Sequence, residues 1–124
     1  MNEALLLLAA LVVKHFVCDF PLQRWPYMYT NKGTYGHFGG LLHALVHWAG
    51  TLVVLIMLTP LTAMSSVLAA ADFLIHYHVD WAKMRLCAHY NLKPNNSEWY
   101  WHLLGLDQLL HYLTYIGITY YALR

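Results

Sequence analysis

The chain has 124 residues, of which 60% are apolar and only 10% are charged, and its formal net charge is +1. Soluble domains carry about 25% charged residues, so this composition indicates a membrane protein. The nearly neutral net charge and the lack of a basic run exclude a nucleic-acid-binding protein.

The first predicted helix covers about residues 2–20 and ends before Pro21. Its apolar run, residues 4–13, follows Glu3 rather than a basic segment, and no small-residue cleavage site comes after it. We therefore expect a retained transmembrane helix and not a signal peptide.

Three further apolar segments follow along the chain. They cover about residues 38–59, 61–81 and 100–123, and Pro60 separates the first two. Each is close to the roughly 20 residues needed to cross the hydrocarbon layer of a bilayer. The sequence therefore predicts an all-α, polytopic membrane four-helix bundle with up-down-up-down topology, which forms a single transmembrane domain over residues 1–124.

The distribution of cations predicts the orientation of this bundle. The connections between the first and second helices and between the third and fourth carry five cations, whereas the other end has only Arg124. By the positive-inside rule both long connections are cytoplasmic and both termini lie on the outer side. The five cations are Arg24, Lys32, Lys83, Arg85 and Lys93.

Each predicted helix also carries acidic or histidine side chains four residues apart, which share one helix face. At about 1.5 Å per residue, these side chains fall into one layer of the cytoplasmic leaflet. Ionisable groups inside a bilayer usually mark a functional site, and facing helices can direct them into one cavity. The sets are His15/Asp19, His43/His47, Asp72/His76/Asp80 and Asp107/His111.

This layer predicts a metal centre. Oxygen and imidazole donors suit zinc, manganese or iron, and eight donors are enough for two divalent ions with open positions. Asp72 lies one turn deeper than His76, so we expect it to support a ligand or to relay protons. The eight predicted ligands are His15, Asp19, His43, His47, His76, Asp80, Asp107 and His111.

Two simpler interpretations compete with the metal centre. The Asp and His side chains could pair only with one another and lock the helices together, or they could conduct protons or ions. Pairing alone is disfavoured because four intramembrane carboxylates carry a large desolvation cost, which Lys14 and Lys83 offset only in part. Outside the pattern, His78 is about 200° around its helix from His76. We expect it, like His37, His89 and His102, to be interfacial or exposed.

The arrangement of these residues resembles a known family pattern. It comprises His15-x-x-x-Asp19-Phe20-x-Leu22-Gln23, a loop lysine, His43-x-x-x-His47, His76-x-x-x-Asp80-x-x-Lys83 and Asp107-Gln108-x-x-His111. It is similar to that of small bacterial and phage membrane proteins called domain of unknown function family 3307, in which Asp72 has no counterpart. The resemblance implies the fold, the site and a bacterial inner membrane, or a phage product inserted there. It leaves the reaction open.

We predict that the protein is a metal-dependent hydrolase of a phosphoester or lipid-derived ester at the cytoplasmic leaflet. The ion would activate water and stabilise the developing oxyanion. Lys83 is expected to hold an anionic headgroup, and Gln23 and Gln108 to orient ligands or substrate. The alternatives are a metal or proton transporter or channel, a di-iron oxidase and a b-type cytochrome. The expected partners are the lipid bilayer and the substrate; the oligomeric state stays open.

Overall fold

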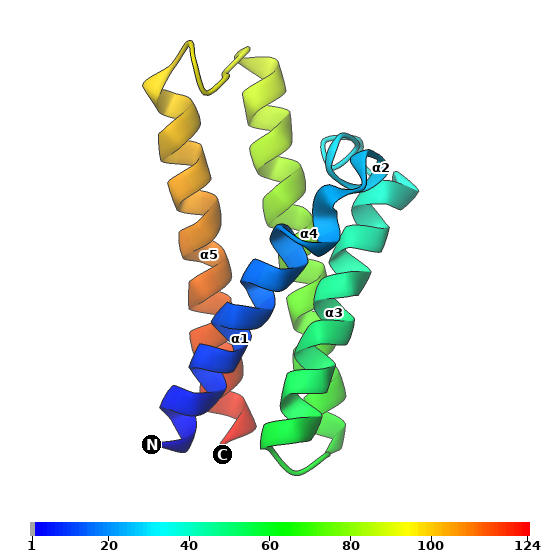
Figure 1. Cartoon of the computed structure of the whole chain (residues 1–124), viewed down its shortest axis with the longest axis vertical. Helices are drawn as coiled ribbons and strands as arrows, with labels where there is room; N and C mark the ends of the chain where they lie inside the picture. Colours follow the sequence, from blue (N-terminus) through cyan, green and yellow to red (C-terminus); the bar gives the residue numbers. More distant parts are fainter. Residues whose placement is uncertain (1) are drawn as a thin grey trace.

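Four long helices and two short ones build the computed structural model, which describes residues 2–124 (Figure 1). No strand occurs in this range. The chain is therefore all-α over the described residues, as predicted. The elements are α1 (Glu3–Asp19), the 3₁₀ helix η1 (Leu22–Arg24), α2 (Pro26–Tyr29), α3 (Phe38–Leu58), α4 (Ala63–His89) and α5 (Glu98–Ala122).

Local sequence signals explain where the long helices begin. Free N–H groups of the first turn need acceptors, and side chains next to the turn supply them. Asn2 Oδ1 accepts from the Ala4 N–H at 2.9 Å, His37 Nδ1 from Gly39 at 3.0 Å, and Ser97 Oγ from Trp99 at 3.2 Å. Proline cannot continue a helix, and Pro21 and Pro60 follow closely after the ends of α1 and α3.

Two predictions of secondary structure need correction. The third predicted helix ends at residue 81, but α4 continues to His89. The prediction stopped where apolar residues give way to Lys83 and Arg85, whereas no proline or glycine interrupts the backbone there. The connection after Pro21 also contains η1 and α2, which were not predicted. The bounds of α1 and α3 agree with the prediction to within one residue.

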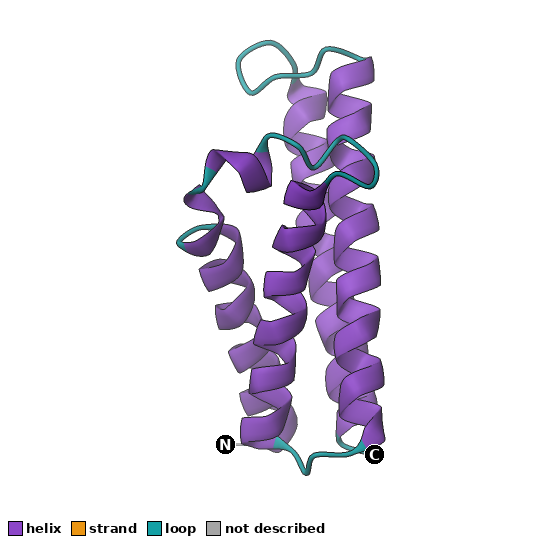
Figure 2. Cartoon of the chain, turned by 90° about the vertical axis from the view of Figure 1, so that its right-hand side faces the viewer, coloured by secondary structure: helices purple, strands orange, loops and turns teal. Residues whose placement is uncertain are grey.

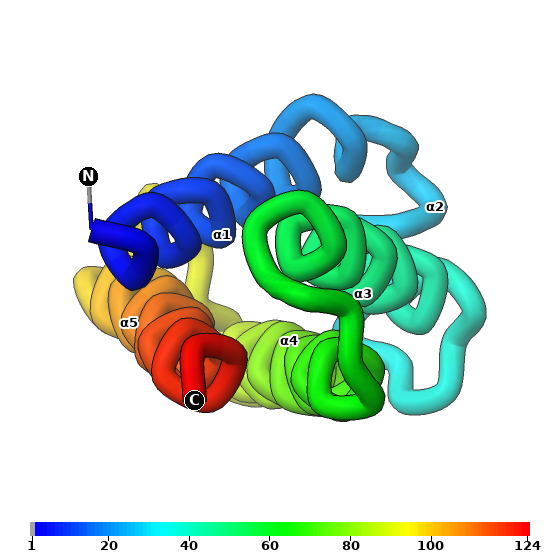
Figure 3. The backbone as a smooth tube through the Cα atoms, turned by 90° about the horizontal axis from the view of Figure 1, so that it is seen from below, coloured from blue at the N-terminus to red at the C-terminus, as the bar shows by residue number. Residues whose placement is uncertain are grey.

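The long helices run alternately up and down, so the two termini and the α3–α4 turn lie at the same end (Figure 1). Seen along the bundle, α1 packs beside α3 and α5, and α4 packs beside the same two helices (Figure 3). At the opposite end, α4 and α5 extend beyond α1 and α3 as a helical hairpin (Figure 2). The segment with η1 and α2 packs beside α3.

The bundle has an apolar half and a polar half. A buried apolar cluster lies toward the termini and consists of Leu7, Leu11, Leu55, Leu68, Tyr115 and Ile118. Most of the buried histidines and aspartates lie in the other half. Within the described residues, Glu3–Arg24 and Phe38–Leu58 are long and apolar enough to cross a membrane. α4 and α5 are long enough but more polar, so four crossings stay a prediction.

A close backbone contact at the start of α3 generates a stability prediction. A Cβ atom on Gly39 would clash with the Tyr27 carbonyl oxygen, whereas one on Gly105 in α5 would meet nothing within 4 Å. We expect Gly39→Ala to cost about 1–3 kcal/mol, because α2 must move away. Gly105→Ala should be neutral or stabilising by up to about 1 kcal/mol. Melting temperatures in detergent measure both, and equal values would contradict the tight contact.

Candidate metal centre

The eight predicted ligands meet in the polar half of the bundle, with one pair from each long helix. Seven of their side chains are buried, and that of Asp19 is 11% exposed. The i, i+4 spacing places both members of a pair on the inward face of their helix. The structure thus brings these eight side chains together.

The donor atoms form two groups, and the larger group has four members, Asp19, His43, His47 and His76. The Asp19 carboxylate lies close to three imidazoles: its Oδ1 is 3.2 Å from His43 Nε2, 3.0 Å from His47 Nε2 and 3.8 Å from His76 Nε2. The two nitrogens His43 Nε2 and His76 Nε2 are 3.0 Å apart. Donors bound to one ion at about 2.0–2.2 Å are separated by about 2.8–3.6 Å. Most of these separations therefore suit a single bound cation.

A second group shares one histidine with the first. His76, Asp80 and His111 each offer a ligand atom, and these atoms lie within 4.8 Å of one another. Asp80 Oδ1 is 3.5 Å from His111 Nε2, and Asp80 Oδ2 is 3.4 Å from His76 Nε2. Asp107 lies at the edge of this group, with Oδ1 3.6 Å from His111 Nε2.

Several buried polar atoms of the cluster have no hydrogen-bond partner. They include His43 Nδ1, His76 Nδ1, His111 Nε2 and Asp107 Oδ1, all of which belong to predicted ligands. An unpaired buried polar atom is costly, and native structures seldom keep one without a water or an ion. The unpaired atoms are therefore consistent with a cation site.

Three buried or nearly buried lysines pair with three of the four aspartates. Lys14 Nζ is 2.8 Å from Asp72 Oδ2, Lys32 Nζ is 2.6 Å from Asp80 Oδ2, and Lys83 Nζ is 3.1 Å from Asp107 Oδ2. Each ammonium offsets part of the desolvation cost of its carboxylate. The carboxylates thus have more compensation than Lys14 and Lys83 alone could provide.

Lys32 is not an exposed loop cation, in contrast to what its position in the sequence suggests. Its side chain is only 7% exposed and reaches into the cluster. The family pattern includes a loop lysine, and that was the one available signal. Lys83 also points into the cluster, at 19% exposure. The exposed cations at this end are then Arg24, Arg85 and Lys93, against Arg124 at the other end.

Asp72 lies outside both donor groups, one turn deeper, as the sequence indicates. Its Oδ2 accepts hydrogen bonds from Lys14 Nζ at 2.8 Å and from Thr51 Oγ1 at 2.5 Å. The same ammonium lies 3.3 Å from His47 Nδ1 and 3.3 Å from the Tyr115 hydroxyl. Asp72 therefore acts on the cluster through Lys14, which suits the supporting role that was predicted for it.

His15 and Gln108 form a supporting pair beside Asp19. His15 Nε2 is 3.1 Å from Asp19 Oδ2 and 3.2 Å from Gln108 Oε1, and His15 Nδ1 is 2.8 Å from the Tyr115 hydroxyl. Both ring nitrogens thus already have partners, and His15 is absent from both donor groups. Gln108 Nε2 also donates to Asp107 Oδ2 at 3.0 Å.

The remaining predicted residues lie at the margin of the cluster or outside it. Gln23 Nε2 donates to the Asp19 backbone carbonyl at 2.8 Å, so this glutamine contacts the end of α1 and not a ligand side chain. His78 is exposed and lies 3.0 Å from the Tyr35 hydroxyl, on another face of α4 from His76. His37 caps α3, and His89 and His102 are exposed.

Comparison with known proteins identifies the family. A family model described as "Protein of unknown function (DUF3307)" matches residues 7–124. The match spans nearly the whole chain, and the chain therefore belongs to this family. No curated protein and no solved structure matches it significantly.

The buried Lys14–Asp72 pair generates a prediction about stability. Asp72→Asn should cost about 3–5 kcal/mol, because it leaves the Lys14 ammonium buried without its carboxylate. The double variant Lys14→Met/Asp72→Asn removes both charges and should be more stable than Asp72→Asn alone. Melting temperatures in detergent measure the difference. A double variant that melts below the single one would show that the ion pair does not dominate this region.

Proposed function

We propose that the protein is a membrane-embedded, metal-dependent hydrolase whose centre is the His/Asp cluster. The observation that carries the proposal is the group of Asp19, His43, His47 and His76. Their donor atoms come from three helices, lie within 4.8 Å of one another and are largely buried. Pairing between helices would give each donor atom its own partner, whereas here three imidazole nitrogens face the single oxygen Asp19 Oδ1, at 3.0, 3.2 and 3.8 Å.

The distribution of side chains supports a membrane location. Apolar residues of α4 and α5 lie on the outside of the bundle, while the four aspartates, five of the histidines and Lys14, Lys32 and Lys83 are directed inside. This is the reverse of a soluble protein, in which large exposed apolar patches are rare. We propose that all four long helices cross the bacterial inner membrane. Outward-facing residues between 39% and 60% exposed include Val67, Leu74, Ile75, Leu106, Leu109, Leu110, Leu113 and Ile116.

The chemistry of the donors supports hydrolysis. When bound, a divalent ion of the zinc, manganese or iron type would activate water and stabilise negative charge on the substrate. Asp19 and the three imidazoles would hold that ion, and His15, which also contacts Gln108, would orient Asp19. Lys83 lies beside Asp107 at the edge of the cluster, where its ammonium can attract an anionic substrate group.

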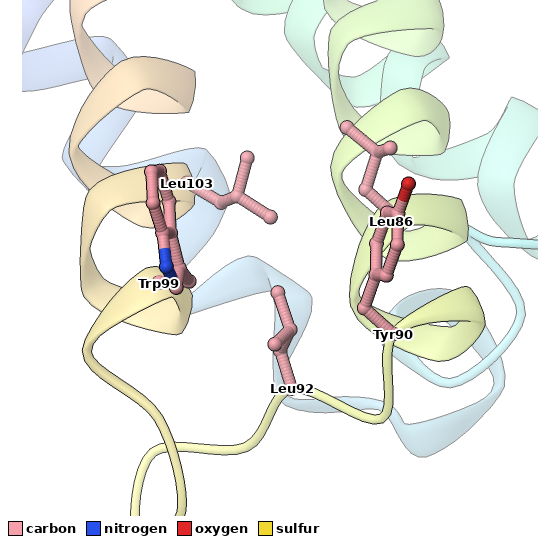
Figure 4. A pocket seen from close by; sticks show the side chains of 5 residues that line it. All are labelled: Leu86, Tyr90, Leu92, Trp99 and Leu103. Carbon is pink, nitrogen blue, oxygen red and sulfur yellow. The ribbon is translucent and has the colours of Figure 1, made fainter.

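Cavities between α4 and α5 support a substrate with an apolar part. One pocket of about 460 Å³ is lined by Leu86, Tyr90, Leu92, Trp99 and Leu103, close to the α4–α5 loop (Figure 4). A second cavity of about 240 Å³ shares Leu86 and Leu103 with it and is also lined by Lys83 and Asp107. Together they form a mostly apolar groove that reaches a polar end, which suits a lipid-derived phosphoester or ester.

Two alternatives fit the geometry less well. A channel needs a polar path through the bundle, but the apolar cluster around Leu7, Leu11 and Leu55 fills the half near the termini. A haem needs space between its axial histidines. The ring centroids of His47 and His76 are only 3.5 Å apart, and those of His76 and His111 are 4.1 Å apart. The packing therefore favours an enzyme that binds individual ions.

Comparison of two histidines in α4 tests the proposal. His76→Ala should lower metal affinity at least tenfold and abolish hydrolysis of p-nitrophenyl phosphate or of a phospholipid in micelles, because His76 belongs to both donor groups. His78→Ala is the matched control for metal binding, and it should leave the metal affinity unchanged. Metal analysis and product release measure the effects. If metal-free wild-type protein hydrolysed these compounds at the full rate, or if both variants behaved alike, the proposal would fail.

Reporter fusions test the topology. The exposed cations favour a cytoplasmic position for the α4–α5 loop, so a reporter fused after Arg124 should behave as periplasmic. A reporter inserted at residues 94–96 should behave as cytoplasmic. A cytoplasmic signal from the fusion at Arg124 would refute the orientation.

A further inference from the structure

The donors of the cluster lie in two different electrostatic environments. We propose that one metal ion binds to Asp19, His43, His47 and His76, and that the ammonium groups of Lys32 and Lys83 replace the second ion that the sequence predicts. The inference rests on the proposed metal centre, and it concerns how many ions the centre holds. Its support comes from the lysine contacts, the sharing of His76 and the total charge.

No lysine contact reaches the four donor atoms of the first group. Lys14 is the nearest cation, but it approaches His47 through Nδ1, while the donor atom Nε2 faces Asp19 Oδ1 at 3.0 Å. The Asp19 carboxylate has histidines as its ion-pair partners among the described residues and no lysine. Asp19 is thus the one aspartate whose negative charge is left for a metal ion to balance.

The second group loses its shared histidine once the first is occupied. A histidine nitrogen has one lone pair, so His76 Nε2 can bind only one ion. Asp80 and His111 then remain, whereas metal sites in proteins usually have at least three protein ligands. Among the described residues nearby, Asp107 could add only Oδ1, 3.6 Å from His111 Nε2, because its Oδ2 accepts from Gln108 and faces Lys83 at 3.1 Å.

Ammonium groups already lie where a second ion would bind. Lys83 Nζ is 4.0 Å from Asp80 Oδ1 and 3.1 Å from Asp107 Oδ2, so it lies beside both carboxylates that would bridge or hold that ion. Lys32 Nζ contacts the other Asp80 oxygen at 2.6 Å. Asp80 is therefore compensated on both of its oxygens.

The backbone holds Lys32 in this position. Its Cα lies 3.5 Å from where a Cβ on Gly40 would be, so the segment packs directly against α3. The following turn is attached to α4, because the Gly36 N–H donates to the Tyr77 hydroxyl at 2.6 Å. Lys32 is thus a fixed part of the centre and not a flexible surface lysine.

The total charge also favours one ion. Four aspartates and three lysines leave one net negative charge, if the histidines are neutral. One divalent ion changes this to one positive charge, which suits the binding of an anionic substrate. Two ions would leave three positive charges in a low-dielectric region, where uncompensated charge is costly.

Two isosteric substitutions test whether the centre binds one ion or two. The experiment uses the full chain in detergent and counts ions per chain by native mass spectrometry and elemental analysis after loading with zinc. We expect one ion in the wild type. Asp19→Asn should lose it, with an affinity at least tenfold lower, whereas Asp80→Asn should keep it. Equal loss in both variants, or two ions in the wild type, would overturn the inference.

Removal of the two lysines tests their role directly. Lys32→Met/Lys83→Met leaves Asp80 and Asp107 uncompensated, and we expect this variant to bind a second zinc ion. Lys32→Arg/Lys83→Arg keeps both charges and should bind one. A Met variant that stays at one ion would refute the replacement of an ion by lysines. If the Met variant does not fold, the comparison of Asp19→Asn with Asp80→Asn still tests the number of ions. A wild type without metal would instead refute the proposed function.

Discussion

The balance of buried charge is the constraint on which the rest of this structure depends. Asp72, Asp80 and Asp107 each have a lysine within 3.1 Å, and Asp19 has only histidines. A buried carboxylate that loses its cation costs about 3–5 kcal/mol, so each of these pairs restricts how the helices can pack. The charge that lacks a lysine partner is at Asp19, where three imidazoles from α3 and α4 also meet. Among the described residues, histidines alone therefore contact this carboxylate.

The two halves of the bundle differ in the side chains that they bury. Leu7, Leu11, Leu55 and Tyr115 form an apolar region near the termini, and the Lys14–Asp72 network lies between that region and the metal-ligand candidates. This network also connects Tyr115 to His15 and His47. Packing in the apolar half can thus hold the imidazoles in position without contributing a ligand.

The hairpin of α4 and α5 lines two cavities that reach the edge of the His/Asp cluster. Its apolar pocket and the adjoining cavity extend from Trp99 and Tyr90 to Lys83 and Asp107. The hairpin is longer than the apolar part of its sequence, because the helix continues past the first charged residues of α4. The same lysine that compensates Asp107 therefore lies at the polar end of an apolar groove.

The sequence by itself determined the long helices and their inward faces. Helical periodicity is local, so the spacing of His43 and His47, or of His76 and His78, shows which side chains share a face. Only the tertiary structure decided which inward residues contact one another. Lys32 belongs to a connection whose path depends on its packing against Gly40, and His15 has Tyr115 and Gln108 as partners because α1 lies beside α5. The end of α4 was missed for a different reason: hydropathy marks where a bilayer could end, whereas hydrogen bonding of the backbone decides where a helix ends.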